Sequence, residues 1–209
     1  MAGVLLTGVN SAIVKALLPL IPNEHVPYQL RRAECDLSNP KEVAANAHIF
    51  KSTDFIVLAH GKLTSDNVLS EAMPVNLYSF IIICETALQN NPRARIVVLG
   101  SESATKGSRD VGYWMAKAGL HSYVRGRKLQ HPGQQLVCVA PSMVMGTGMT
   151  AQKSPEQVAA AIASHPKQRG LEPIEVAKLI HFLLFVDQGY ITNTIVEING
   201  GKFAGSGVQ

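Results

Sequence analysis

The 209-residue sequence predicts an α/β fold in which helices cover both faces of a doubly wound parallel sheet. Short apolar runs that end in glycine or serine alternate with segments of helical periodicity along nearly the whole chain. These runs are apolar at consecutive positions, as in parallel strands that are buried on both faces. The stretch between Leu20 and Ala33 leaves no room for a strand and a full helix. We therefore expect a sheet that is trimmed around its second strand.

The first half of the chain supplies the first strands and two short helices. An apolar run at residues 4–8 ends in a glycine turn, and the helix after it is stopped by Pro19 and Pro22. Residues 25–30 can form only a short strand. The next elements that we expect are a strand at 33–37, a helix at 39–50 and a strand at 54–61.

The second half continues the alternation without a linker. A long apolar helix is followed by strands and helices that turn residues separate. The elements that we expect here are helices at 72–89, 112–130, 154–165 and 172–187, and strands at 94–101, 135–142 and 193–200. Residues 1–209 should form a single domain, with a loose tail at 201–209.

Composition limits the classes of function. Hydrophobic residues make up 46% and charged residues 16% of the chain, which is typical of a folded globular protein. The net charge of +4 is scattered, and aromatic residues make up only 6%, so nucleic acid is not an expected partner. We see no secretory leader and no apolar run long enough to span a membrane, and we expect a cytoplasmic protein.

The three cysteines, Cys35, Cys84 and Cys138, each lie in or beside an apolar run. We expect buried free thiols and no disulfide. The spacing of histidines and cysteines does not suggest a metal site. The sequence also lacks the nucleophile motif of α/β-hydrolases and the phosphate loop of nucleotide hydrolases.

The segment TGVNSAIV, residues 7–14, is a candidate phosphate-binding turn. A strand-to-helix turn directs backbone N–H groups and the helix dipole at a diphosphate. Only Gly8 supplies the usual glycine, because Ala12 and Val14 stand where further glycines are common. An ordinary β–α turn explains the segment equally well.

The segment GYWMAKAG, residues 112–119, carries the candidate catalytic pair. Tyr113 and Lys117 are four residues apart, which puts them on one face of a helix. A nearby ammonium favours the phenolate and lowers the pKa of a tyrosine, which then serves as an acid or base. Taken alone, the pair is more often an ordinary surface pair.

Two polar residues add context to this pair. Ser101 ends the preceding strand, where a hydroxyl can bind a reacting oxygen, and Ser103 is its rival. Asn76 lies among apolar residues early in the long helix, where its amide can kink the helix or hold a water near the lysine. An ordinary near-terminal asparagine is an equal alternative.

With these residues in place, the chain resembles the short-chain dehydrogenase/reductase superfamily from about Val4 to Gly201. The order and spacing of the pieces carry this resemblance. The pieces are LLTGVNSAI, CDLS, FIVLAHG, VNLYSF, RIVVLGSES, GYWMAKAGL, VAPSMVMGTGM, EVAKLIHFLLF and TNTIVEINGG.

The resemblance implies a Rossmann-like fold and an NAD(P)-dependent oxidoreductase that interconverts a carbonyl and a secondary alcohol. Tyr113 would be the acid/base, and Lys117 would lower its pKa and hold the nicotinamide ribose. Ser101 would orient the substrate carbonyl, and Asn76 would hold a water in the proton relay.

The resemblance also implies a dinucleotide site. Asp36 would meet the adenine amino group, and Gly61 would line the adenosine ribose. The residues expected around the cofactor are Gly8, Asn10, Ser11, Ala12, Ile13, Arg31, Asp36, Leu37, Ala59, His60, Gly61, Tyr113, Lys117, Pro141, Ser142, Val144 and Thr147.

The sequence departs from the family pattern mainly in this cofactor pocket. The usual Asn-Asn-Ala-Gly reads Leu-Ala-His-Gly at residues 58–61, so an asparagine that would brace the sheet is missing. His60 could act as a proton shuttle, but a loop histidine with satisfied hydrogen bonds is the better interpretation. Ser142 replaces a common glycine. These departures bear on cofactor affinity more than on chemistry.

The end of the second strand separates NAD from NADP. An acidic residue there binds the ribose hydroxyls, whereas arginine accommodates a 2′-phosphate. Arg31 and Arg32 follow this strand, so we favour NADP over NAD, although either arginine could simply be solvated.

The remaining expectations concern partners and alternatives. The helix at 73–88 is apolar almost all round, and the resemblance implies a homodimer or homotetramer through it and the helix at 112–130. The substrate should meet residues 143–170. Two other functions stay open: a non-catalytic dinucleotide-fold module, and a redox-neutral use of the same site.

Overall fold

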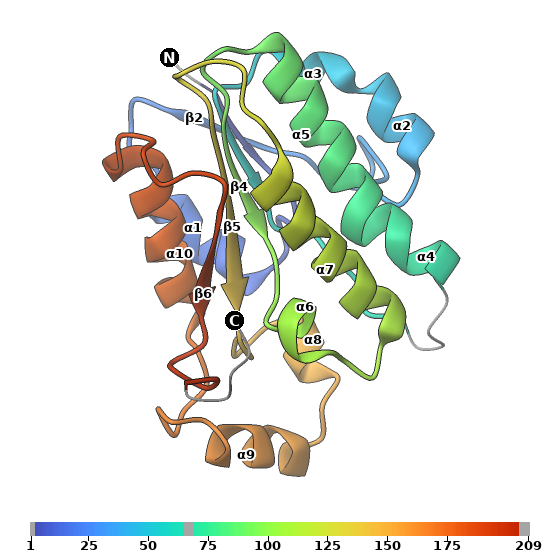
Figure 1. Cartoon of the computed structure of the whole chain (residues 1–209), viewed down its shortest axis with the longest axis vertical. Coiled ribbons are helices and arrows are strands. Elements are labelled where there is room, and N and C mark those ends of the chain that lie inside the picture. The colour runs from blue at the N-terminus through green and yellow to red at the C-terminus, as the bar shows by residue number, and fades with distance from the viewer. Residues whose placement is uncertain (1–2, 65–68, 205–209) are drawn as a thin grey trace.

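The computed structural model describes residues 3–64 and 69–204. Its centre is a sheet of six parallel strands in the order β2-β1-β3-β4-β5-β6 (Figure 1). The strands are β1 (Gly3–Leu6), β2 (Val26–Gln29), β3 (Phe55–Leu58), β4 (Arg95–Leu99), β5 (Gln135–Pro141) and β6 (Thr194–Ile198). This is the doubly wound parallel sheet that the sequence predicts.

Helices cover the sheet on both faces. On one face lie α2 (Pro40–Ala45), α3 (Ala47–Lys51), α4 (Leu69–Met73), α5 (Ser79–Asn90) and α7 (Val111–Gly126), and on the other lie α1 (Ala12–Leu17) and α10 (Pro173–His181) (Figure 1). Consecutive residues of β3 show why the strands are apolar throughout. Ile56 and Leu58 pack in the core under α5, and Val57 packs in the core under α1 and α10.

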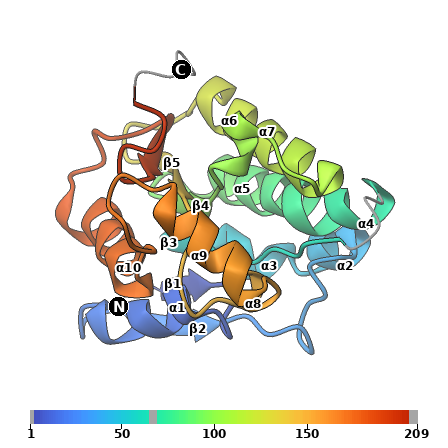
Figure 2. The same cartoon turned by 90° about the horizontal axis from the view of Figure 1, so that it is seen from below.

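The short helices α6 (Ser103–Lys106), α8 (Gly148–Ala151) and α9 (Pro155–Ala163) lie at the carboxyl end of the sheet (Figures 1 and 2). In doubly wound sheets this end is where ligands bind. The sequence did not predict α6 or α8. Thr147 caps α8, because its hydroxyl accepts a hydrogen bond from Thr150 N at 3.3 Å.

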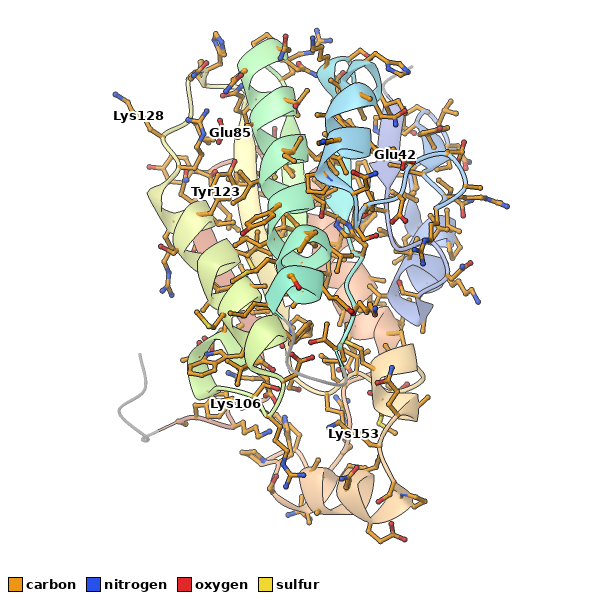
Figure 3. All side chains as sticks on the ribbon, turned by 90° about the vertical axis from the view of Figure 1, so that its right-hand side faces the viewer. Glu42, Glu85, Lys106, Tyr123, Lys128 and Lys153 are labelled. Carbon is orange, nitrogen blue, oxygen red and sulfur yellow. The ribbon has the colours of Figure 1, made fainter. Side chains whose placement is uncertain are left out.

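A half-buried polar cluster joins α5 to the end of α7. The Tyr123 hydroxyl donates to Glu85 Oε1 at 2.7 Å (Figure 3). Arg127 NH2 donates to Glu85 Oε2 at 3.0 Å. The phenol and the guanidinium thereby hold the Glu85 carboxylate, and its pKa stays below the ordinary value although burial acts to raise it.

The expected strand at 33–37 is wrong, because this stretch forms turns. Backbone hydrogen bonds from Glu34 N and Cys35 N to Arg31 O close one turn, at 2.9 and 3.1 Å. The Asp36 carboxylate accepts from Ser38 N at 2.9 Å and closes the next. The sheet is therefore trimmed as expected: beyond β1 it has only the edge strand β2, which matches the short strand expected at 25–30.

Several helix boundaries also differ from the expectation. The helix expected at 39–50 is split at Asn46, whose side chain donates to the Glu42 carbonyl at 3.0 Å. The helix expected at 72–89 begins at Leu69 and contains a π-helical turn, η2 (Pro74–Tyr78). The helix expected at 112–130 ends at Gly126. The helix expected at 172–187 ends in a second π-helical turn, η3 (Phe182–Val186).

All three cysteines are free and buried, as the sequence predicts. Among the described residues, no helix has the length and apolar character needed to cross a bilayer. Of the tail expected at 201–209, residues 201–204 form a turn, and the rest lies outside the described residues.

Candidate active site

Helix α7 places Tyr113 and Lys117 on its inner face, at the carboxyl end of the sheet. Asp110 begins this helix by accepting a hydrogen bond from Tyr113 N at 2.8 Å, and its carboxylate also holds the Thr64 hydroxyl at 2.9 Å. Tyr113 is 6% exposed and Lys117 is 2% exposed. Lys117 Nζ lies 5.7 Å from the centre of the Tyr113 ring. The helical spacing therefore brings the two side chains together, as the sequence predicts.

The Lys117 ammonium is held on the side of the pair that faces the sheet. Its Nζ donates a hydrogen bond of 2.7 Å to the Leu99 carbonyl and lies 4.6 Å from the centre of the Phe80 ring. A buried ammonium with so few acceptors loses its proton more readily than in water. Burial accordingly lowers the pKa of Lys117 to about 8.

The pKa of Tyr113 moves in the direction opposite to the expected one. Burial raises it to about 12, and hydrogen bonding with Ser101 opposes this rise only in part. At neutral pH the phenol is therefore protonated, which is the form that can give a proton to a carbonyl oxygen.

Ser101 lies immediately beyond β4 and reaches the same site. It is 9% exposed, it contacts the Tyr113 phenol, and its Oγ accepts a hydrogen bond from Ser103 N at 3.1 Å. Ser103 begins α6, so its backbone is engaged in this turn. Ser101 is thus the serine beside the phenol.

Asn76 occupies the π-helical turn η2 and is fully buried. Its Oδ1 accepts from Lys62 N at 3.0 Å, and its Nδ2 donates to Lys62 O at 2.8 Å. This amide therefore clamps the chain that follows β3. A Cβ added to Gly61 would lie 3.1 Å from Asn76 Oδ1 and 3.9 Å from Lys117 Nζ, so the backbone of Gly61 links the two residues.

A groove of about 1050 Å³ runs from this point along the carboxyl ends of β2, β1 and β3. Nine of the residues expected around the cofactor line it: Gly8, Asn10, Ser11, Arg31, Asp36, Leu37, Ala59, His60 and Gly61. Eight expected residues do not line it: Ala12, Ile13, Tyr113, Lys117, Pro141, Ser142, Val144 and Thr147. The groove thus unites the predicted diphosphate turn with the predicted adenosine side.

Gly8 shows why one glycine remains in the first turn. Its φ is +66°, and a Cβ there would overlap the backbone carbonyl of Ala59. Ser11 lines the groove at the start of α1 and caps that helix by accepting from Val14 N at 3.2 Å. These features fit a diphosphate, and Ala12 narrows the turn by only one methyl group.

His60 replaces the missing asparagine as a brace between strands. Its Nδ1 lies 2.7 Å from Thr7 Oγ1, its Nε2 lies 2.9 Å from Ser79 Oγ, and its ring stacks on Phe80 at 4.0 Å. Thr7 Oγ1 in turn accepts from Ala59 N at 3.1 Å. Both ring nitrogens are therefore satisfied, and burial lowers the pKa of His60 well below its usual value. The sequence did not reveal Thr7 and Ser79 as its partners.

The two arginines after β2 differ in their surroundings. Arg32 pairs with the Asp36 carboxylate at 3.0 Å, and this carboxylate also accepts from the Ser38 hydroxyl at 2.6 Å. Among the described residues, the Arg31 guanidinium makes no hydrogen bond or ion pair. Arg31 lines the groove and is the arginine that remains available to an anion there.

The residues expected around the nicotinamide lie after β5. Ser142 N donates to the Ile198 carbonyl at 3.2 Å, and its Oγ lies 3.5 Å from His165 Nε2. The Thr147 hydroxyl donates a hydrogen bond to Val144 O at 3.1 Å. Met149 of α8 lies close to Gly61, since its Cε would lie 3.4 Å from a Cβ there. Met149 therefore brings α8 next to the site.

Reductases and dehydrogenases are among the known proteins that this chain resembles in sequence and fold. Residues 2–202 match the family model described as enoyl-(acyl carrier protein) reductase. The 3-oxoacyl-(acyl-carrier-protein) reductase FabG of Vibrio cholerae is 28% identical over 186 residues, which are 80% of this chain and 75% of that protein.

Two solved structures have the same fold over nearly their whole length. A short-chain dehydrogenase family protein from Francisella tularensis aligns with a TM-score of 0.81 at 24% identity, over 98% of this chain and 99% of that one. The 3-alpha-hydroxysteroid dehydrogenase from Pseudomonas sp. B-0831, solved with NADH, aligns with a TM-score of 0.78 at 22% identity, over 97% of each chain.

Proposed function

Since the chain belongs to the short-chain dehydrogenase/reductase superfamily, through the family model of enoyl-(acyl carrier protein) reductase that matches residues 2–202, we propose that Tyr113, Lys117 and Ser101 reduce a carbonyl or oxidise a secondary alcohol. The chain is thus an NAD(P)-dependent oxidoreductase acting on CH–OH groups. The observation that carries the proposal is the buried Tyr113–Lys117 pair, which lies beside Ser101 at the end of a groove of dinucleotide size.

In the reductive direction the Tyr113 phenol gives its proton to the carbonyl oxygen. The bound nicotinamide dinucleotide supplies the hydride for the carbonyl carbon. Ser101 donates a hydrogen bond to the same oxygen and holds it near the phenol. The Lys117 ammonium stabilises the phenolate that remains, at 5.7 Å from the ring centre, until a proton returns.

Asn76 acts as a positioning residue in this proposal. Its two hydrogen bonds to the Lys62 backbone fix the chain after β3. They thereby hold the Gly61 backbone against the lysine that serves the phenol. We infer that the π-helical turn exists to aim this amide, since π-helical turns inside helices are frequent at functional sites.

We propose that the cofactor is NADP rather than NAD. The exposed Arg31 guanidinium at the rim of the groove suits a 2′-phosphate. No carboxylate of the adjacent turn is left to hold ribose hydroxyls, because Asp36 pairs with Arg32, and Glu34 binds Arg31 N at 2.9 Å and the Tyr28 hydroxyl at 2.9 Å.

The relatives suggest the substrate class to test first. A 3-oxoacyl thioester carries the ketone on which 3-oxoacyl-(acyl-carrier-protein) reductases act by name. We propose that such a ketone binds beside Ser101 and the Tyr113 phenol, with Met149 of α8 close to the same end of the groove.

The proposal is tested with purified protein by following NADPH oxidation with a 3-oxoacyl thioester and a panel of other ketones. We compare Tyr113→Phe, which removes the acid, with Trp114→Phe, which changes the neighbouring half-exposed ring. Loss of an acid–base group costs about 10²–10⁴-fold in rate, so the first variant should be inactive and the second active. Equal rates in both variants would refute the role of Tyr113.

We also propose a homodimer or homotetramer through the helices at 73–88 and 112–130. Tyr78 at the end of η2 and Met115 on α7 are 46% and 45% exposed, which is unusual for large apolar side chains. Sedimentation of Met115→Glu should show a smaller species than the parent protein. An unchanged sedimentation coefficient for this variant would argue against this interface.

A further inference from the structure

A second pocket of about 510 Å³ lies between α6, α7 and β6. None of its lining residues lines the dinucleotide groove or belongs to the proposed reaction site. Pockets of this volume hold small molecules in proteins. The pocket therefore needs its own explanation.

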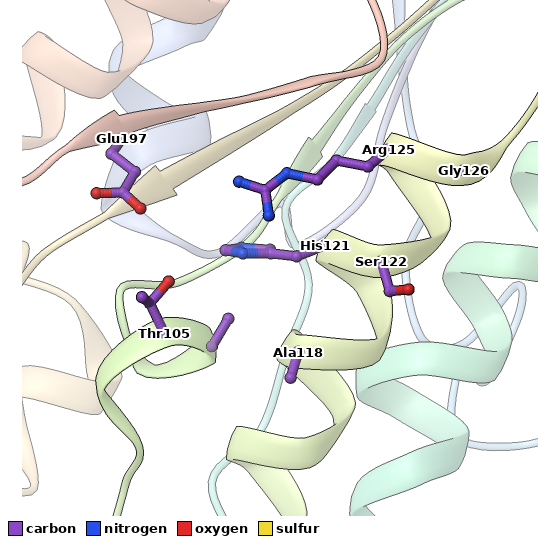
Figure 4. A pocket seen from close by; sticks show the side chains of 8 residues that line it. Thr105, Ala118, His121, Ser122, Arg125, Gly126 and Glu197 are labelled. Carbon is purple, nitrogen blue, oxygen red and sulfur yellow. The ribbon is translucent and has the colours of Figure 1, made fainter. Parts of the chain in front are cut away.

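Two opposite charges face each other across this pocket. Figure 4 shows the Arg125 guanidinium of α7 pointing toward the Glu197 carboxylate of β6, with the Thr105 hydroxyl beneath the space between them. No ion pair joins Arg125 to Glu197 in the described part of the chain. Within the same residues, neither the guanidinium nor the Thr105 hydroxyl makes a hydrogen bond. Glu197 Oε2 accepts from Asn199 Nδ2 at 2.7 Å, and Oε1 remains available.

The floor of the pocket is the His121 ring (Figure 4). His121 is 6% exposed, and its Nε2 is buried without a hydrogen-bond partner. A Cβ added to Gly100 would lie 2.5 Å from this Nε2, so the ring is wedged against the end of β4. Burial, followed by the charges of Lys117 and Arg125, lowers the pKa of His121 to about 4, so the ring is uncharged at neutral pH.

This arrangement selects a ligand by charge. A simple anion on Arg125 would also face the Glu197 carboxylate, and a simple cation on Glu197 would face the guanidinium. A ligand with separated carboxylate and ammonium groups satisfies both ends, and its methylene chain can lie over the uncharged ring. Thr105 adds a hydroxyl that either donates or accepts.

We infer that the pocket formed by Thr105, His121, Arg125 and Glu197 binds a small zwitterion of the amino-acid type. The ligand carboxylate pairs with Arg125, and its ammonium pairs with Glu197. The site begins one helical turn beyond Lys117 on the same helix, but its ligand contacts no residue assigned to the redox reaction. The inference therefore stands whether or not the proposed redox function is correct.

The experiment titrates glycine, β-alanine and γ-aminobutyrate into the full chain while histidine ring signals are recorded by NMR. The signal of His121 is assigned by its loss in His121→Gln. Butyrate and butylamine, which each carry one of the two charges, are titrated in parallel. At least one zwitterion should shift the His121 signal to saturation, and the singly charged compounds should bind at least about tenfold more weakly.

Variants locate the site. Arg125→Gln and Glu197→Gln change exposed side chains, so both should fold, and each should weaken zwitterion binding by at least about tenfold. The matched control is Lys128→Gln, which removes an exposed charge near the same end of α7 and should leave binding within about twofold.

Two outcomes would overturn the inference. The first is the absence of a saturable shift with every zwitterion at millimolar concentration, which would make the pocket a solvated crevice. The second is binding of butyrate as tightly as γ-aminobutyrate together with no effect of Glu197→Gln, which would make it a simple anion site.

Discussion

The reaction end and the dinucleotide groove meet at Gly61, yet the sequence builds them in different ways. At the reaction end, Tyr113 and Lys117 come from one helix, and their spacing alone brings them together. In the groove, the turn at Gly8 is held by residues far away in the sequence, because Thr7 and His60 are 53 residues apart in the chain.

This contrast separates departures from the family pattern that another residue can offset from positions where no change is tolerated. The loss of the usual asparagine after β3 is offset by another side chain, since His60 joins Thr7, which follows β1, to Ser79 of α5. Gly8 has no such substitute, because both its φ and its contact with Ala59 require the absence of a side chain. The groove thus tolerates a change in the side chains that hold its strands together, such as His60, but it does not tolerate a side chain at Gly8.

The largest expected effect is on turnover at the reaction end. Lys117→Met removes the charge that stabilises the phenolate and should lower kcat/KM on the order of a hundredfold or more. Steady-state kinetics with the best ketone of the panel measure it. Lys106→Met, which removes an exposed partner of Glu102, serves as the comparison and should stay near the parent value. Parent activity in Lys117→Met would show that the lysine does not serve the phenol, and would refute the role given to the reaction end.

The same lysine should make stability depend on pH. The pKa of Lys117 is about 8 in the folded chain, against 10.5 for a lysine exposed to water, so from pH 8 toward 10 the folded protein loses a proton that the unfolded chain keeps. Lys117 should therefore add up to about 3 kcal/mol to the free energy of unfolding across this window. The buried thiols of Cys84 and Cys138 act in the opposite direction from about pH 9, because burial raises their pKa and the unfolded chain loses these protons first. The pKa of Tyr113, raised from 10 to about 12, acts in the opposite direction only above pH 10.

Urea unfolding at several pH values checks this dependence. Lys117→Met should lack the contribution of the lysine, so the free energy of unfolding of the parent minus that of the variant should rise between pH 8 and 10. Parallel pH profiles of the parent and the variant would show that the ammonium is not desolvated in the folded chain.

In the groove, the strongest effect should come from Gly8→Ala. Residue 8 has a left-handed backbone, which alanine disfavours, and the added Cβ would overlap the Ala59 carbonyl. The variant should therefore lose about 1–3 kcal/mol of stability. Its affinity for NADPH should fall as the turn moves. The control is Gly3→Ala, where the new Cβ has no atom within 4 Å. Equal melting temperatures for the two variants would contradict the structural argument.

The smallest expected effect concerns cofactor choice. Arg31→Gln should weaken NADPH binding about tenfold and leave NADH binding unchanged, because only NADPH carries the 2′-phosphate. Arg32→Gln should have less effect, since Arg32 is paired with Asp36. Fluorescence titrations with both cofactors give the ratio. If the ratio of NADPH to NADH affinity changed equally in both variants, the preference for NADPH would come from the overall positive charge of this region and not from Arg31.

The sequence predicted the parallel sheet, its trimmed second strand and the approach of Tyr113 to Lys117, because these follow from local periodicity and helix geometry. It placed a strand at 33–37, where hydrogen bonds to Arg31 O and to the Asp36 carboxylate favour turns. The apolar residues of this stretch do not reveal that hydrogen bonds within turns compete with strand formation.

The sequence also could not give the partners of Asn76 and His60. The amide of Asn76 binds the backbone of Lys62, and backbone groups leave no trace in side-chain patterns. His60 binds hydroxyls from two other elements, which only the tertiary fold brings within reach. The expected lowering of the pKa of Tyr113 failed because burial, which depends on all neighbours, raises this pKa and the hydrogen bond with Ser101 opposes the rise only in part.

The most direct test of the account follows deuterium from C4-labelled NADPH into the product of the best ketone, with the parent protein and Tyr113→Phe side by side. The parent's product should carry the label on its carbinol carbon, and the variant should transfer it at least about a hundredfold more slowly at unchanged NADPH affinity. Undiminished transfer by the variant, or a product formed by the parent without label, would contradict it.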